Sequence, residues 1–149
     1  MLKNDRKNRI TDIILDHWNE LRDVRKFPSE SELDLGHLSS IWDNCFLVQT
    51  RDVLTKENYN YTYLGKNIID AYGRDLTNMS IMALASEQAD HISFKYEEVI
   101  RTGTFMYDEG EFLNAKKMKV KYRQVLVPLG DDNCHVQSIL GGMRYKLFK

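Results

Sequence analysis

Four histidines and two cysteines are the side chains in this sequence best suited to metal or nucleophilic chemistry, and their spacing supports neither. His17, His37, His91 and His135 are scattered, and none lies at a metal-ligand spacing from a cysteine or a carboxylate. The sequence also contains no Gly-rich phosphate loop, no Gly-x-Ser-x-Gly elbow and no Cys-x-x-Cys pair. We therefore expect a protein that is not an enzyme and that binds no metal through a dedicated cluster.

The cysteines and the hydropathy pattern indicate a cytoplasmic protein. Cys45 and Cys134 are both expected in strands, and two thiols without a secretion signal favour a reducing compartment over a disulfide framework. No apolar run approaches the roughly 20 residues of a membrane-spanning helix. The basic segment 1–9 leads into an amphipathic helix rather than into a secretory signal.

The totals describe one globular domain with little net charge. Of the 149 residues, 42% are hydrophobic and 29% are charged, which is an ordinary globular balance. The formal net charge is −1 and the pI about 6.4, so no overall field attracts nucleic acid or an anionic membrane. A basic run from Lys116 to Arg123 alternates in period two, which predicts the solvated face of a strand that could meet a partner protein.

Apolar residues recur at intervals of three and four between about residues 8 and 25, which predicts an amphipathic helix. This stripe either packs on the domain's own core or shares in a homodimer contact. The candidate contact residues are Ile10, Ile14, Trp18 and Leu21. Pro28 disfavours a helical residue before it, so we assign 1–28 to the helix and linker and 29–149 to the main domain.

The stretch from Tyr59 to Asn78 changes its period midway. Tyr59, Tyr61 and Tyr63 occupy alternate positions, which predicts a strand with the three rings on one face. Gly65 ends this strand, and a helical spacing from Ile68 to Tyr72 follows, which Gly73 closes. A strand therefore leads through one short helix into a polar corner.

This stretch resembles the PAS family of sensory domains, in particular its branch of small free-standing alpha-proteobacterial proteins. The matching positions are Gly65, Ile68, Tyr72, Gly73, Arg74, Asp75, Leu76 and Thr77. Thr62, Lys66 and Asn78 stand where the family usually has Arg, Thr and Gly. Segments 125–129 and 136–141 resemble the end of the same family, so the resemblance extends over about residues 10 to 145.

The rest of the chain predicts an α+β domain. Helices are expected near 79–85 and 87–102, and strands at 45–50, 59–64, 104–107, 116–129 and 134–148. We also expect turns at 108–110 and 130–133, a bulge or bend at Gln124, and a bend at Gly141-Gly142. The PAS resemblance implies a five-stranded antiparallel sheet of order 2-1-5-4-3, with short helices on one face and an N-terminal amphipathic helix.

The same resemblance implies a cavity between the sheet and the short helices, in which a small molecule could be enclosed. The residues expected near it are Tyr63, Ile69, Tyr72, Phe94, Met106, Leu126 and Leu140. Arg74 is the candidate to meet an anionic group at the rim, or else it pairs locally with Asp70 or Asp75. For the tyrosines, core packing explains the pattern as well as ligand contact does.

Two cofactor alternatives rest on single residues. His91 lies in the helix that carries the proximal histidine in haem-binding PAS domains, so the resemblance makes haem one possible ligand. The sequence around Cys45 resembles the Asn-Cys-x-Phe-Leu motif of flavin-binding photoreceptor PAS domains, but it precedes the central motif instead of following it. A buried strand cysteine explains Cys45 better, and the sequence requires no cofactor.

We expect a cytoplasmic, single-domain sensory or regulatory protein that works by population shift, in which a small ligand or a signalling partner protein favours one arrangement of the short helices. A homodimer through the N-terminal helix is one route for its output. The alternatives are a ligand-free interaction or dimerisation module and a haem-binding sensor.

Overall fold

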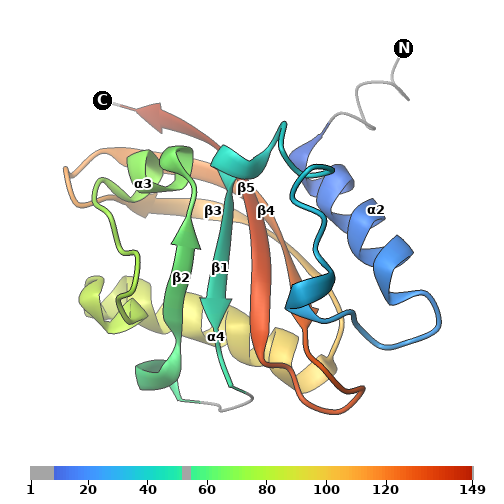
Figure 1. Cartoon of the computed structure of the whole chain (residues 1–149). Coiled ribbons are helices and arrows are strands. Elements are labelled where there is room, and N and C mark those ends of the chain that lie inside the picture. The colour runs from blue at the N-terminus through green and yellow to red at the C-terminus, as the bar shows by residue number, and fades with distance from the viewer. Residues whose placement is uncertain (1–8, 52–54, 149) are drawn as a thin grey trace.

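The computed structural model describes residues 9–51 and 55–148, which form an α+β domain around one sheet (Figure 1). The sheet has five antiparallel strands in the order β2-β1-β5-β4-β3, as the resemblance implied. The strands are β1 (Cys45–Gln49), β2 (Asn60–Leu64), β3 (Met106–Leu113), β4 (Lys119–Leu129) and β5 (Ser138–Phe148).

Within the described residues, three α-helices pack against the sheet, and four short 3-10 segments join the elements. The helices are α2 (Ile10–Arg22), α3 (Lys66–Tyr72) and α4 (Ser86–Thr102). The 3-10 segments are η1 (Glu30–Glu32), η2 (Trp42–Asn44), η3 (Lys56–Asn58) and η4 (Ile81–Ala83). Figure 1 shows α4 passing behind β1 and β2, while α2 lies at the other side of the sheet. Of the basic segment 1–9, residues 1–8 lie outside the described residues.

Helix α2 packs within the chain, against β4 and β5. Ile14 is fully buried and Trp18 is 1% exposed, and the Trp18 Nε1 donates a hydrogen bond of 2.8 Å to the Pro128 carbonyl. Ile10 and Leu21 are only partly buried. Of the four residues considered for a dimer contact, Ile14 and Trp18 are therefore core residues in this arrangement.

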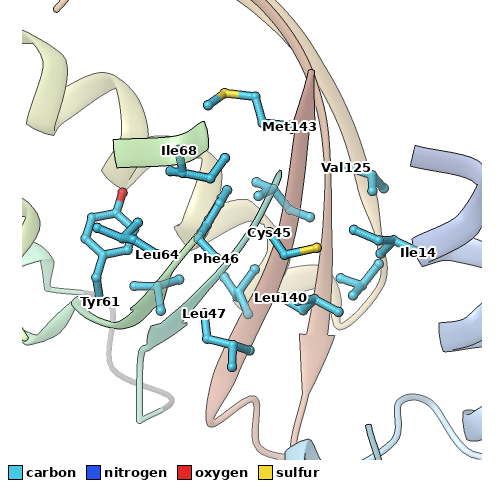
Figure 2. Close-up of a cluster of buried hydrophobic side chains, with 14 of the residues drawn as sticks. Ile14, Cys45, Phe46, Leu47, Tyr61, Leu64, Ile68, Val125, Leu140 and Met143 are labelled. Carbon is cyan, nitrogen blue, oxygen red and sulfur yellow. The ribbon is translucent and has the colours of Figure 1, made fainter. Parts of the chain in front are cut away.

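The centre of the sheet is buried on both faces, which we call the α2 face and the α4 face. Gly141 and Gly142 lie on opposite faces, and a Cβ on either would overlap a neighbouring side chain, Phe46 on the α4 face and Ile14 on the α2 face. The pair thus permits close packing on both sides of β5, where we predicted a bend. Figure 2 shows Phe46 beside Tyr61 and Ile68, and Cys45 beside Ile14.

Burial on both faces also explains the apolar run in β4. The register of β4 is continuous against β3 and β5, so the bulge predicted at Gln124 is wrong. Val125 and Val127 face α2, while Gln124 and Leu126 face α4, and all of them are buried. The alternating pattern ends because both faces become buried, not because an extra residue is inserted in the strand.

A real irregularity occurs between β1 and β2. Leu47 pairs with Tyr63 and Val48 pairs with Tyr61, so Thr62 is an extra residue on β2. This bulge turns Tyr61 toward the α4 face and Tyr63 toward the α2 face, and the prediction that both share one face is wrong. Tyr63 stacks on Trp42 with ring centroids 4.5 Å apart, and its hydroxyl donates to the Trp42 carbonyl.

Strand β3 continues through the turn predicted at 108–110. The chain instead turns at 114–117, where Asn114 accepts hydrogen bonds from the Lys116 and Met118 amides and Lys117 adopts a φ of 62°. At the other hairpin, residues 131–135 are exposed and β5 begins only at Ser138, so Cys134 lies in a loop and not in a strand.

The residues of the central motif have structural roles. Gly65 lies against the backbone of Asp43, where a Cβ has no room, and Gly73 closes α3 with a φ of 79°. Asn78, which stands where the family usually has Gly, has a φ of 65°. Asparagine tolerates this left-handed conformation better than other non-glycine residues, so the substitution preserves the turn.

We predict that Gly141→Ala lowers the free energy of unfolding by about 1–3 kcal/mol, because the new methyl group displaces the buried Phe46 ring. Urea unfolding of both proteins would measure the difference, with the exposed Gly36→Ala as the control. In a Phe46→Leu background the cost of Gly141→Ala should fall, because the smaller side chain leaves space. An equal cost in both backgrounds would contradict the packing explanation.

Candidate functional site

A cleft of about 420 Å³ opens between α4 and the adjoining ends of β3 and β4. Its volume is within the range of small-molecule sites. One part of its wall is apolar or aromatic and consists of Tyr72, Ala85, Ile92, Phe112, Leu113 and Met143. The rest is polar or charged and consists of Glu87, Gln88, His91, Lys95, Glu111, Tyr122 and Gln124.

The polar wall is organised around one carboxylate oxygen, Asp108 Oδ2. It accepts hydrogen bonds from Lys95 Nζ at 2.8 Å, from the Tyr122 hydroxyl at 2.9 Å and from Gln124 Nε2 at 2.9 Å. Lys95 Nζ also donates to the Tyr122 hydroxyl at 2.6 Å. The side chains of Lys95 and Asp108 are only 15% and 11% exposed, so water screens this pair weakly.

This arrangement determines the charge of the polar wall. Burial lowers the pKa of Lys95, but its bonds to Asp108 and Tyr122 more than offset that effect, so the pKa is raised above its ordinary value. Burial raises the pKa of the Tyr122 hydroxyl. The part of the wall around Asp108 therefore presents a charged lysine, a neutral phenol and an amide, all of which can bond a ligand's polar groups.

Three tyrosine hydroxyls meet behind the cleft. The Tyr61 hydroxyl lies 3.0 Å from that of Tyr96 and 3.4 Å from that of Tyr72, which also lines the cleft. Burial raises the pKa of all three well above the ordinary value, so they are neutral. Because each hydroxyl can donate or accept, the group can reorient its hydrogen bonds when a ligand contacts Tyr72.

The structure brings together only part of the residue set predicted for the cavity. Tyr72 lines the cleft, and Met106 and Leu126 are paired on the same α4 face of the sheet. Ile69 is partly buried against the core. Leu140 lies on the α2 face because successive side chains of β5 point to opposite faces of the sheet. Tyr63 lies on the α2 face because of the bulge at Thr62. Phe94 is 63% exposed on α4, so its predicted position at the cavity is wrong.

Arg74 connects the loop after α3 to η4 and does not line the cleft. It donates to the Ala83 carbonyl at 3.3 Å and to the Met79 sulfur at 3.8 Å. Neither alternative partner is used, because Asp75 accepts from the Thr77 amide and hydroxyl, and Asp70 accepts from the Tyr145 hydroxyl.

The residues around His91 fit haem poorly. His91 lines the cleft but is exposed, and its neighbours in the wall include Glu87, Glu111 and Lys95. A proximal histidine needs an apolar pocket around the iron, and this end of the cleft is polar. His17 and His37 stack with ring centroids 4.6 Å apart, yet no group of three metal-binding side chains occurs among the described residues.

Cys45 lies on the α2 face of β1, away from the cleft. It is fully buried, and its Sγ donates to the Ile41 carbonyl at 3.3 Å. Burial raises the pKa of the thiol from 9.0 to about 12, which disfavours the reactive thiolate. Its local resemblance to a photoreceptor cysteine therefore has no counterpart in three dimensions.

The polar wall contains functional candidates that sequence reasoning missed. The Asp-Glu-Gly sequence predicts a turn at Asp108, and no motif in the sequence points to Lys95 or Gln124. The sequence contains one indication of this site. Lys95 lies three residues after Ile92 and four before Val99, and therefore on the apolar side of the predicted helix, where a charged residue is unusual.

The family model of the PAS domain matches residues 6–144 of this chain. Comparison with curated proteins found no match. In the part of the chain that the structure describes, no helix is long and apolar enough to cross a membrane.

Several solved structures share the fold at low identity. The LOV protein of Rhodobacter sphaeroides is 11% identical, with a TM-score of 0.54 over 71% of this chain and 63% of that one, so this chain spans less than two-thirds of it. A sensory box sensor histidine kinase from Vibrio cholerae is 13% identical, with a TM-score of 0.51 over 75% and 90% of the two chains. A PAS domain from Colwellia psychrerythraea is 16% identical, with a TM-score of 0.51 over 74% and 94%.

Asp108→Ala should lower the free energy of unfolding by about 3 kcal/mol, because it leaves the mostly buried Lys95 charge unpaired. Urea unfolding would test this, and in a Lys95→Met background the same substitution should cost much less. Glu109→Ala, which breaks the exposed pair with Arg123 on the other face of β3, should cost less than about 1 kcal/mol. Equal costs for the two carboxylates would contradict the assigned role.

Stability should fall at alkaline pH because of Cys45. Its folded pKa is raised, so its contribution is complete below pH 9 and is lost as the pH rises toward 12. Between pH 8 and pH 10 we expect a loss of about 1.4 kcal/mol from this thiol alone. Cys45→Ala should remove that part of the slope in urea unfolding, while Cys134→Ala, at an exposed position, should leave it unchanged.

Proposed function

Because the chain belongs to the PAS family of sensory domains, we propose that it binds an amphipathic small molecule in the cleft between α4 and β3–β4 and passes this signal to a partner protein. The proposal makes the protein a non-catalytic sensor, and we expect it to act in the cytoplasm.

The observation that carries this proposal is a cleft with an apolar wall facing a polar cluster. A filled interaction module has no need of a mostly buried Lys95–Asp108 pair at the edge of an open cleft, because charged groups cost free energy when removed from water. A ligand with an apolar body and a few polar atoms would place the body against Ile92 and Phe112. Its polar atoms would reach Lys95, Tyr122 and Gln124.

Binding would be transmitted by population shift. Helix α4 supplies one wall and contacts η4, and the sheet supplies the other wall. A ligand that contacts both walls favours the arrangement of α4 and the sheet to which it binds more tightly. It can shift the equilibrium between two such arrangements only by the difference between its affinities for them.

Native mass spectrometry of freshly purified protein, with an absorbance scan of the same sample, tests ligand binding directly. We expect extra mass on the folded species that is lost on denaturation. Ile92→Trp fills the cleft and should abolish the extra mass, whereas Phe94→Trp, on the exposed side of the same helix, should retain it. Extra mass retained by Ile92→Trp would place the ligand elsewhere.

The same experiment separates the alternatives. A Soret band would support a haem-binding sensor in spite of the polar surroundings of His91. A clean apo mass, together with no binding to the wild type from an extract of small metabolites, would support a ligand-free interaction module.

A further inference from the structure

The α2 face of the sheet carries a square of four cations beyond the part that α2 covers. Arg123 on β4 is paired directly with Arg144 on β5, and Lys121 is paired directly with Lys146. The two pairs are two residues apart, so all four side chains are on the same face, and all four residues are exposed. We call these residues the cation square.

The cation square is unfavourable for the isolated fold. Like charges directly opposite one another on neighbouring strands destabilise a sheet. Arg123 is paired with Glu109 at 3.2 Å, but Lys121, Arg144 and Lys146 form no ion pair with another described residue. Lys121 lies directly opposite Glu111 on β3, but Arg144 and Lys146 have only cations opposite them on β4. Three cations without an ion pair among the described residues, beyond the part of the face that α2 covers, indicate a surface that is completed by an anion.

The borders of the cation square limit the kind of anion. Glu109 and Glu111 lie along β3 on one side, and Asp12 at the start of α2 lines the same groove. A long nucleic acid strand or a flat anionic membrane would meet these carboxylates as well as the cations, and its binding would be opposed. A short acidic segment avoids them.

We propose that the cation square docks an acidic peptide segment of a partner protein. Its two cation pairs are about 6.6 Å apart along the strands, which is also the spacing of alternate side chains in an extended peptide. Two carboxylates at alternate positions can therefore each meet one pair, Arg123 with Arg144 and Lys121 with Lys146. Phe148, 46% exposed at the edge of the groove, offers apolar contact.

Strand β4 connects this surface to the cleft. Tyr122 and Gln124 line the cleft, while their neighbours Lys121 and Arg123 lie in the cation square on the opposite face. If a ligand in the cleft regulates the docking of the acidic segment, that regulation rests on the proposed function. The docking itself does not depend on a ligand and can be tested without one.

The experiment measures fluorescence anisotropy of a labelled octapeptide of alternating glutamate and serine, titrated with the full chain at 50 and 150 mM salt. A single-stranded oligonucleotide of eight thymidines serves as the second probe. The test variant is Arg144→Glu/Lys146→Glu. The control variant is Lys116→Glu/Lys117→Glu, which changes the net charge equally in the exposed β3–β4 turn.

We expect the test variant to weaken peptide binding at least tenfold and the control variant less than twofold, with weaker binding at the higher salt. Lys146→Glu alone should raise the urea midpoint of the fold, because it replaces a repulsive pair with Lys121 by an attractive one. Equal losses in both double variants, absence of peptide binding to the wild type, or tighter binding of the oligonucleotide would overturn the proposal.

Discussion

The burial of the sheet centre on both faces is the constraint from which the other features follow. Where β1, β5 and β4 meet, α2 closes one face and the α3–α4 layer closes the other, and Gly141 and Gly142 leave room for both. The strands continue beyond the region that the helices cover. There the α4 face opens into the cleft and the α2 face carries the cation square, so both candidate surfaces arise at the incompletely covered end of the sheet.

The cleft and the cation square differ in how their charged groups are compensated. On the α4 face, Asp108 is mostly buried and accepts three hydrogen bonds, so its charge is compensated within the domain. On the α2 face, Arg123 and Lys121 of β4 lie opposite Arg144 and Lys146 of β5, and these cations remain in water. The buried Asp108 and Lys95 are paired, because an ion removed from water is costly without a partner, whereas three of the four exposed cations need no ion pair because water solvates them.

The sequence was sufficient for features that depend on local periodicity. The alternation of Lys119, Lys121 and Arg123 identified the exposed face of β4, and the spacing from Ala89 to Val99 identified α4. Features that depend on distant contacts were missed or placed wrongly. The local sequence predicts a turn at Asp108, and only the fold shows that Lys95 lies beside it. The local sequence likewise predicts a bend at the double glycine, and only the fold shows that Phe46 and Ile14 pack against it. The candidate site is built mainly from such contacts, so of the residues expected around the cavity only Tyr72 lines the cleft, and the polar wall was not predicted.

The contact between Trp18 and Pro128 has a consequence for self-association of the sheet. Leu126 is the last residue of β4 that pairs with β3, so Pro128 lies where that side of β4 has no neighbouring strand. Leu129 bonds toward β5 through its carbonyl, so the carbonyl of Pro128 points to the open side, where it accepts from the Trp18 indole. Proline has no N–H to offer there, and its carbonyl is already occupied. This short open stretch of β4 is therefore closed to strand addition.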